Sequence, residues 1–386
     1  MRVTHLINLS ETAGRNPFSG AERHLFLLMQ EQKRHGCAVE FAPLVFCSGP
    51  ILEQKFRELQ ERGITVTPIH AGSPDFRRLR IPLLILRMLL FFRARRHDII
   101  HTHLDIADFA ARIAAYGAGC RYIINTFHND EPHYRRLLWR WQLRFTGGLT
   151  RCSIVISDHI RQYLIDAVGL PEANIHTIPY GIAVPETTLS RTSTRQLLNI
   201  PNGVFVVGFV GRLEQQKQPL FFLRAVAGMP DIHAVIIGEG SMLSQLIRET
   251  RNLPQGKIII AGYRADAADL MPAFDLFCLP SRWEGLGYVL LEAMARNVPV
   301  LGSTSGAIPE ILDNGKYGFL FATGNTEDLR AQIQKIKNNP EIAVPKTQAA
   351  QRRVREHFSI DTMTEQTIAT YQHMYQHPSS ITPHAE

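Results

Sequence analysis

Short apolar runs alternate with segments of helical periodicity through the first 180 residues. Strands are predicted at 2–7, 38–46, 64–69, 98–101, 121–126 and 152–156. Helices are predicted near 20–35, 51–62, 80–96, 105–117, 132–148 and 158–167. A chain that alternates in this way buries both kinds of element best as a parallel sheet with helices on both faces. The pattern therefore predicts the α/β class.

The same alternation resumes in the second half of the chain. Strands are predicted at 204–211, 232–238, 257–261, 275–279 and 298–302. Helices are predicted at 241–251, at 266–273, from 288, and through most of the chain after 327. Two doubly wound sheets suit a length of 386 residues, which is about two domains.

The predicted organisation has two domains and a linker. Residues 183–200 are rich in Thr, Ser and Arg without an apolar period, which is typical of a linker with an exposed entry helix. The boundaries are expected at 1–182 for the first domain, 183–203 for the linker, 204–360 for the second domain, 361–376 for a helix that crosses back to the first domain, and 377–386 for a disordered tail.

Composition narrows the functional classes. A hydrophobic content of 45% with 20% charged residues fits a globular protein with large cores. The first residues carry no charged-then-apolar export signal, so a cytoplasmic location is expected. The five cysteines are scattered without a C-x-x-C pair, which favours reduced thiols over disulfides or zinc.

A strand, a glycine loop and a helix follow one another between residues 275 and 295. Gly285 and Gly287 bracket Leu286 in the loop, and a helix begins near Tyr288. Glycines let backbone N–H groups approach a ligand closely, and the first turn of a helix attracts anions. The arrangement therefore predicts a phosphate site, although a packing helix without a ligand gives the same spacing.

Two carboxylates flank this predicted anion site, Glu284 on the loop and Glu292 one turn into the helix. Acceptor-only carboxylates suit the hydroxyl groups of sugars on both sides of a diphosphate. At the end of an earlier strand, Gly211 is followed by Arg212 and Lys217, two cations that can bind a diphosphate. A surface Lys/Arg pair without such a role is equally compatible with the spacing. Further candidates for contacts to the nucleoside end the next two strands: Gly238, Glu239, Gly262 and Tyr263.

Two stretches resemble glycosyltransferase family 4, whose members have the GT-B fold. They are the run from Glu284 to Ala295, Glu-Gly-Leu-Gly-Tyr-Val-Leu-Leu-Glu-Ala-Met-Ala, and the pattern Gly-Arg-Leu-x-x-x-Lys that ends at Lys217. The resemblance implies two Rossmann-like domains facing a cleft. It places a UDP- or GDP-linked sugar in the second domain and the acceptor in the first, with hexose transfer that retains the anomeric configuration. Bacterial enzymes of cell-surface polysaccharide or lipopolysaccharide synthesis are the nearest type.

The resemblance also implies roles for two residues of the first domain. Gly20 falls in the family's Gly-Gly turn toward the donor phosphate, with Ser19 in place of the first glycine. His128 falls on the cleft histidine, whose backbone or ring contacts the transferred sugar. Tyr180 stands where the family usually has Asn, which puts a polar role for that turn in doubt.

The expected catalytic set is His128, Arg212, Lys217 and Glu284. The cations and the helix that starts after Gly287 would stabilise the leaving phosphate. Glu284 is assigned to hydroxyls of the transferred sugar and Glu292 to the ribose. No acidic metal motif of the D-x-D type is suitably placed, so no metal or other cofactor is expected and activity in a chelator is predicted.

Several alternatives remain open or are disfavoured. A GT-B nucleotide-sugar epimerase and a non-catalytic, membrane-bound partner of the same fold are the alternatives to a transferase. The loop after the first strand lacks G-x-G-x-x-G, which disfavours a nicotinamide or flavin enzyme. His101 and His103 form an H-x-H pair, but no third ligand stands at a plausible spacing, so a metal site is rejected.

Positive charge is concentrated in the first half of the chain. The whole net charge of +7 arises from residues 1–185. Segments 76–96 and 133–145 mix arginines with leucines and aromatic residues, and the mostly apolar part of 76–96, which Arg87 interrupts, is too short to span a membrane. For 76–96 alone a core helix is favoured, but the two segments together predict docking on an anionic membrane, peripheral on the cytoplasmic face of the inner membrane. Nucleic-acid binding is disfavoured because the arginines do not form one exposed stripe.

Overall fold

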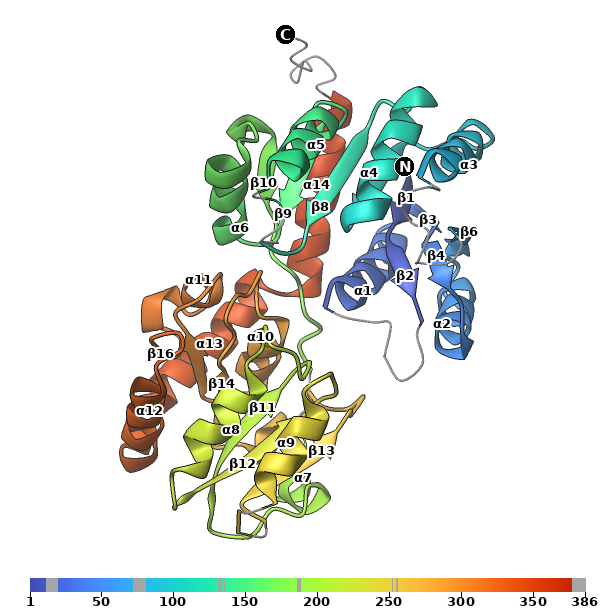
Figure 1. Cartoon of the computed structure of the whole chain (residues 1–386). Coiled ribbons are helices and arrows are strands. Elements are labelled where there is room, and N and C mark those ends of the chain that lie inside the picture. Colours follow the sequence, from blue (N-terminus) through green and yellow to red (C-terminus); the bar gives the residue numbers. More distant parts are fainter. Residues whose placement is uncertain are drawn as a thin grey trace. The chain divides into compact units, whose positions relative to one another are not determined.

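The computed structural model describes residues 1–11, 20–71, 81–130, 134, 136–185, 189–251, 253–254 and 256–376. The predictions for Ser19, for residues 76–80, 133 and 135, and for the tail 377–386 lie outside these residues. The chain forms two compact units (Figure 1). The first comprises residues 1–181 and the C-terminal residues from Ile360 onward, and the second comprises Ile182–Ser359.

The first unit contains a seven-stranded parallel sheet. Its order is β10 (Ile175–Thr177), β9 (Cys152–Val155), β8 (Ile123–Phe127), β7 (Ile99–His103), β1 (Arg2–Leu6), β3 (Ala38–Phe41) and β5 (Thr65–Val66). A smaller parallel sheet consists of β2 (Asn8–Ser10), β4 (Leu44–Cys47) and β6 (Ile69–His70).

Two predicted strands of the first unit are each divided between these two sheets. The runs predicted at 38–46 and 64–69 break at Pro43 and Pro68, whose missing N–H groups cannot join a ladder. The strand predicted at 2–7 is confirmed as β1, and the separate strand β2 begins at Asn8. Continuous strands at 38–46 and 64–69 were therefore wrong predictions, although the strand character was right.

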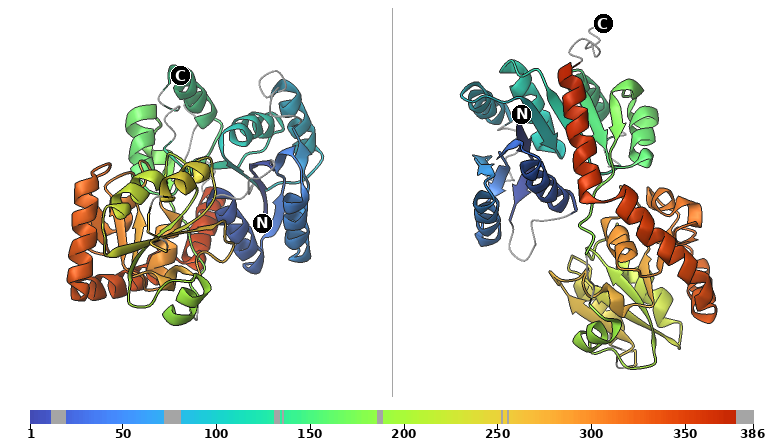
Figure 2. Two further views of the ribbon diagram at one scale, coloured as in Figure 1. Left: turned by 60° about the horizontal axis from the view of Figure 1, so that its bottom comes forward. Right: turned by 180° about the vertical axis from the view of Figure 1, so that it is seen from behind.

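Helices cover both faces of the larger sheet. One face carries α3 (Ile81–Arg93), α4 (Asp105–Gly117) and α5 (Leu137–Gly147), with α3 and α5 both against α4. The other carries α1 (Gly20–Arg34), α2 (Pro50–Glu61) and α14 (Ile360–Gln376), with α14 against α1 (Figure 2). This division follows from right-handed crossovers between parallel strands. The helix predicted at 158–167 is α6 (Asp158–Tyr163) followed by a π-helical turn, Leu164–Val168.

The second unit contains a six-stranded parallel sheet. Its order is β13 (Ile258–Gly262), β12 (Ile232–Ile237), β11 (Phe205–Val210), β14 (Leu276–Leu279), β15 (Val300–Ser303) and β16 (Phe319–Phe321). Its helices are α7 (Arg191–Leu197), α8 (Pro219–Ala227), α9 (Leu243–Thr250), α10 (Tyr288–Ala295), α11 (Ile308–Ile311), α12 (Thr326–Asn338) and α13 (Ala343–His357).

The chain of the second unit moves outward in two directions from the middle of its sheet. It passes from β11 to β12 and β13 on one side, and from β14 to β15 and β16 on the other. The point between β11 and β14 is where loops diverge and where open α/β sheets bind ligands. The predicted α/β class with two doubly wound parallel sheets is confirmed.

The prediction of a helix at 266–273 was wrong. Turns occupy most of this segment, and Met271–Ala273 forms a single 3-10 turn. Pro272 has no N–H for a helical bond, and most of the bonds present run over three residues, such as Asp269 N–H to the Asp266 carbonyl at 2.9 Å. Among the described residues, no helix has both the length and the hydropathy needed to cross a membrane.

Candidate active site

Two loops meet between β11 and β14, at the switch point of the second sheet, where the chain begins to move outward in the opposite direction. They are residues 211–218 after β11 and residues 280–287 after β14. The Arg282 N–H donates to the Gln216 carbonyl at 2.8 Å. The Gln216 side-chain amide donates to the Trp283 carbonyl at 3.1 Å. Gln216 therefore ties the loop with the predicted cations to the loop with the predicted carboxylate.

Lys217 and Glu284 form an ion pair at this point. Their side chains are only 13% and 9% exposed. The Ser281 hydroxyl donates to the same carboxylate oxygen at 2.9 Å. The structure thus brings two predicted catalytic residues together across 67 positions of sequence.

Arg212 lies on the surface of the same loop. Its guanidinium donates to the Gln216 side-chain oxygen at 3.0 Å. This bond uses one of the five N–H donors of a guanidinium, so the geometry is compatible with a second, anionic partner. Arg212 and Lys217 thus both contact the residues that join the two loops.

The predicted glycines stand side by side at the carboxyl ends of β11, β12 and β13. Gly211 and Gly238 have φ of 157° and 151°. A Cβ on Gly238 would lie 1.9 Å from the Gly211 carbonyl oxygen, so only glycine permits this approach. The Gly238 N–H donates to the Gly262 carbonyl at 2.8 Å, and Tyr263 follows with 52% of its surface exposed. The Glu239 carbonyl accepts from Leu213 N–H at 2.8 Å, which places Glu239 beside the loop after β11.

Helix α10 begins directly after the glycine loop. Gly287 takes the left-handed conformation at its N-cap, with φ of 92°. Gly285 and Leu286 precede it in the buried part of the loop, and Tyr288 is the first helical residue. Glu292, one turn in, is buried. The first turn of α10 therefore starts next to the Lys217–Glu284 pair.

A turn after β15 supports the Glu284 backbone. The Ala307 N–H donates to the Glu284 carbonyl at 2.9 Å. Gly306 has φ of 58°, and a Cβ there would lie 2.2 Å from that carbonyl oxygen. The supporting roles of Gln216, Ser281 and Gly306 were missed, because loop-to-loop contacts leave no periodic pattern in a sequence.

The first unit holds the remaining predicted site residues. Gly20 is the first residue of α1, and a Cβ there would meet no atom within 4 Å. Packing of the described residues therefore does not require glycine at this position. His128 directly follows β8 and is half-buried.

Both ring nitrogens of His128 are hydrogen-bonded. Nε2 bonds His103 Nδ1 at 3.0 Å, and Nδ1 bonds the Tyr180 hydroxyl at 2.5 Å. Burial lowers the pKa of His128 from 6.5 to about 3, so the ring is neutral at pH 7. The doubt about a polar role for Tyr180 was therefore wrong, because this residue provides a hydroxyl to the predicted site histidine.

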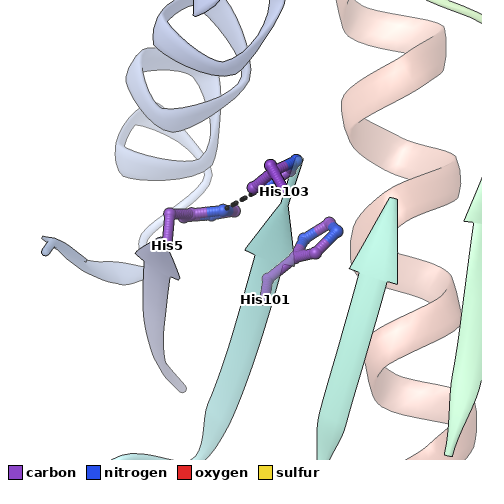
Figure 3. A group of neighbouring side chains, drawn as sticks. All are labelled: His5, His101 and His103. Carbon is purple, nitrogen blue, oxygen red and sulfur yellow. Dashed lines mark hydrogen bonds between the residues drawn. The ribbon is translucent and has the colours of Figure 1, made fainter. Parts of the chain in front are cut away.

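His5, His101 and His103 form a buried group of imidazoles at the neighbouring strands β1 and β7 (Figure 3). Their candidate ligand atoms lie within 4.8 Å of one another. The stated ground for rejecting a metal at the H-x-H pair, the lack of a third ligand, was wrong, since His5 lies next to the pair through strand pairing. Spacing along the chain does not reveal a ligand from another strand.

Hydrogen bonds nevertheless account for all three rings. His5 bonds His103 at 3.2 Å and Gln32 at 2.7 Å. His101 bonds the Tyr371 hydroxyl at 2.6 Å and the Thr126 hydroxyl at 2.7 Å. A metal ion would have to replace some of these bonds.

The fold and two family models define the class of protein. A model described as Glycosyltransferase Family 4 matches residues 18–184, and a model described as Glycosyl transferases group 1 matches residues 190–355. Together they span most of both units. The chain therefore belongs to glycosyltransferase family 4, and its two Rossmann-like sheets are those of the GT-B fold.

Individual relatives have the same type of activity. The chain is 26% identical over 272 residues to a UDP-Gal:α-D-GlcNAc-diphosphoundecaprenol α-1,3-galactosyltransferase of Escherichia coli, covering 66% of this chain and 70% of the relative. It is 29% identical over 293 residues to an N-acetyl-α-D-glucosaminyl L-malate synthase of Bacillus anthracis, covering 72% and 74%.

Solved structures share the fold over nearly the whole chain. HepE of Anabaena in complex with UDP and glucose superposes with a TM-score of 0.79 at 22% identity, covering 96% of this chain and 99% of that one. The lipopolysaccharide outer core galactosyltransferase WaaB superposes with a TM-score of 0.70 at 16% identity, covering 97% and 100%.

Proposed function

We propose that the protein transfers a hexose from a nucleoside-diphosphate sugar to a glycan or lipid-linked acceptor in cell-envelope polysaccharide synthesis. The observation that carries this proposal is the Lys217–Glu284 pair, which lies at the switch point of the second sheet beside the start of α10. A cation, a carboxylate and a helix N-terminus there suit a diphosphate that bears a sugar.

A uridine nucleotide is the first donor to test. The Escherichia coli relative is named for UDP-Gal, and HepE was solved with UDP and with UDP-glucose. A GDP-linked sugar is the second candidate. Nothing in the described residues favours an epimerase or a non-catalytic partner.

We assign the diphosphate to Arg212, Lys217 and the first turn of α10. In this assignment Glu284, held by Lys217 and Ser281, accepts from hydroxyls of the transferred sugar, and Glu292 accepts from the ribose. We assign contacts with the nucleoside to Gly238, Glu239, Gly262 and Tyr263. The remaining predicted residues are assigned backbone contacts with the donor: Gly20, Gly211, Gly285, Leu286, Gly287 and Tyr288.

The proposed reaction retains the anomeric configuration. The bond between the anomeric carbon and the phosphate oxygen breaks, and its electron pair stays on the phosphate. Lys217, Arg212 and the α10 N-terminus stabilise that charge. The same phosphate takes the proton of the acceptor hydroxyl, whose oxygen attacks from the face that the phosphate leaves. These positive groups can take the place of a divalent cation, so we expect turnover without one.

A lipid-linked acceptor is supported by the surface of the first unit. Along α5, Leu137, Leu138, Trp141 and Phe145 share one helical face and are 63–79% exposed. Arginines at 136, 140 and 144 run beside them. Apolar side chains next to cationic ones suit the interface of an anionic membrane.

Helix α3 lies in the same layer and adds to this surface. Its inner side is buried through Leu84 and Met88, as a core helix requires. Its outer side exposes Leu83, Leu86 and Leu90. Helix α3 therefore has the buried side expected of a core helix and the exposed apolar side expected of a membrane-docking helix. We propose that this layer docks at the cytoplasmic face of the inner membrane.

Co-sedimentation with liposomes tests the docking surface. Wild-type protein should sediment with vesicles of anionic phospholipid at low salt, and Leu138→Ser/Trp141→Ser should remain in the supernatant. Leu197→Ser/Ile247→Ser removes two exposed apolar residues of the second unit and should behave as wild type. Equal sedimentation of all three proteins would refute the surface.

Turnover and stereochemistry test the function. The protein is incubated with UDP-linked and GDP-linked hexoses and a polyprenyl-diphosphate sugar acceptor, and the product is analysed by proton NMR. We expect an α-linked product from an α-linked donor. An inverted product would refute the mechanism, and free sugar without an acceptor product would refute the transferase assignment.

A further inference from the structure

An unbroken chain of hydrogen bonds runs through the first unit and ends at His128. The Tyr180 hydroxyl bonds His128 Nδ1, and His128 Nε2 bonds His103 Nδ1. His103 Nε2 then bonds His5 Nδ1 at 3.2 Å, the link drawn in Figure 3. Finally, His5 Nε2 bonds the side-chain oxygen of Gln32 at 2.7 Å. Each imidazole of the chain uses both of its nitrogens.

The chemistry of a neutral imidazole determines which atom donates in each hydrogen bond of this series. Burial lowers the pKa of His5 to about 4 and that of His103 well below 6.5, so both rings are neutral at pH 7, like His128. A neutral ring has one N–H donor and one acceptor nitrogen. The Gln32 oxygen can only accept, so His5 carries its proton on Nε2. The same step then places the proton on Nε2 of His103 and of His128.

Gln32 also bonds a residue of α14. Gln32 is fully buried, and its amide N–H donates to the Tyr371 hydroxyl at 3.2 Å. Tyr371, also fully buried, can in turn donate to His101 Nδ1 at 2.6 Å. Reversing the Gln32 amide would reverse every bond of the chain at once. The tautomers of His5, His103 and His128 are therefore coupled to the orientation of the Gln32 side chain.

Helix α1 contacts both ends of this chain of hydrogen bonds. Gln32 lies on α1, and so does His24, which is eight positions earlier and therefore on the same helical face. The His24 ring stacks on Tyr180, with ring centroids 4.1 Å apart and an interplanar angle of 29°. The phenol that donates to His128 is thus fixed in position as well as in hydrogen bonding.

We propose that Gln32 sets the tautomer and the ring orientation of His128 through this chain, which makes Gln32 and Tyr180 positioning residues for the transfer reaction. The proposal rests on the assignment of His128 to the transferred sugar. Both ring nitrogens of His128 are hydrogen-bonded to residues of the first unit. The contact with the transferred sugar is therefore assigned to the backbone of His128. The ring then serves to hold that backbone in place.

A spectroscopic measurement tests the chain without any substrate. Two-bond proton–nitrogen NMR spectra of protein with ¹⁵N-labelled histidine distinguish a protonated ring nitrogen from an unprotonated one, and single His→Gln variants assign the signals. We expect His5, His103 and His128 all to carry the proton on Nε2. Gln32→Met should change the His128 signals, whereas Leu28→Met, a buried residue of the same face between His24 and Gln32, should not.

Three results would overturn the proposal at this stage. They are a proton on Nδ1 of His128, unchanged His128 signals in Gln32→Met, or one equivalent of tightly bound metal by elemental analysis. A metal held by His5, His101 and His103 would replace the hydrogen bonds on which the coupling depends.

Kinetics test the consequence for the reaction. Gln32→Met and Tyr180→Phe should each lower kcat about tenfold, with little change in KM for the donor, because small errors in position slow the chemical step. Tyr116→Phe, which changes an exposed tyrosine of the same unit, should leave both constants unchanged. Wild-type kcat in both variants would refute the positioning role while leaving the proposed function intact. A wild-type protein that transfers no sugar would refute the proposed function, and the NMR tautomers would still decide the chain.

Discussion

Replacing Lys217 separates the structural role of the ion pair from its proposed catalytic role. In Lys217→Met, the carboxylate of Glu284 stays 9% exposed and keeps the hydroxyl of Ser281 as a partner, but loses its counter-charge. Removing one partner of a buried pair costs about 3 kcal/mol. In Lys217→Met/Glu284→Gln no buried charge remains, so most of this stability should return. Turnover should fall about 100-fold in both variants, because the leaving phosphate loses its cation in each.

Trp283 gives a local probe for this experiment, since it directly precedes Glu284. The protein has three tryptophans, and Trp139→Phe/Trp141→Phe leaves Trp283 as the only one. Urea denaturation followed by its fluorescence, in the absence of nucleotide, then reports the stability of the second unit for each variant.

A matched control is available in the same unit. Lys337 forms an ion pair with Asp231, whose side chain is 74% exposed, so Lys337→Met should cost less than about 1 kcal/mol and leave turnover normal. If Lys217→Met is as stable as wild type, the pair contributes nothing. If it turns over at the wild-type rate, the assignment of Lys217 to the phosphate is wrong.

Three further outcomes are expected. Gly238→Ala should destabilise the second unit by about 3 kcal/mol because its Cβ would meet the Gly211 backbone, whereas Gly256→Ala has open space and should cost about 1 kcal/mol for its positive φ; equal urea midpoints would contradict this. Burial lowers the pKa of His5 and His97 from 6.5 to about 4, so the unfolded chain takes up protons first as the pH falls below 6.5; stability should drop by about 2 kcal/mol per histidine between pH 7.5 and 5, and a flat profile would refute this. Turnover should persist in excess EDTA, and its loss with recovery on added Mg²⁺ or Mn²⁺ would show that the protein cations are insufficient.

Much of the second unit could be predicted from the sequence because its elements are short and continuous. The four strands β11 to β14 are apolar runs that end at a glycine or a proline, and parallel strands place those ends along one edge. The proximity of Lys217 and Glu284 follows from that rule once the strands are recognised. The contacts made by Gln216 and Ser281 do not follow, since they depend on loop conformations that have no period.

The first unit was less predictable for a related reason. Pro43 and Pro68 lie within apolar runs that were predicted as continuous strands, and the runs themselves do not show that the two halves enter different sheets. The partners of the histidines come from strands and helices far apart in the chain: His5 from β1, Gln32 from α1 and Tyr371 from α14. A buried polar network of this kind is specified by tertiary packing, so local sequence patterns cannot reveal it.

Calorimetric titration with UDP tests the central claim most directly, namely that the loops after β11 and β14 bind the diphosphate of the donor. Wild-type protein and Lys337→Met should bind UDP with the same Kd, and Lys217→Met/Glu284→Gln, folded by the fluorescence criterion, should bind at least about tenfold more weakly. An unchanged Kd in the double variant, or no binding of UDP or GDP by the wild-type protein, would contradict the account.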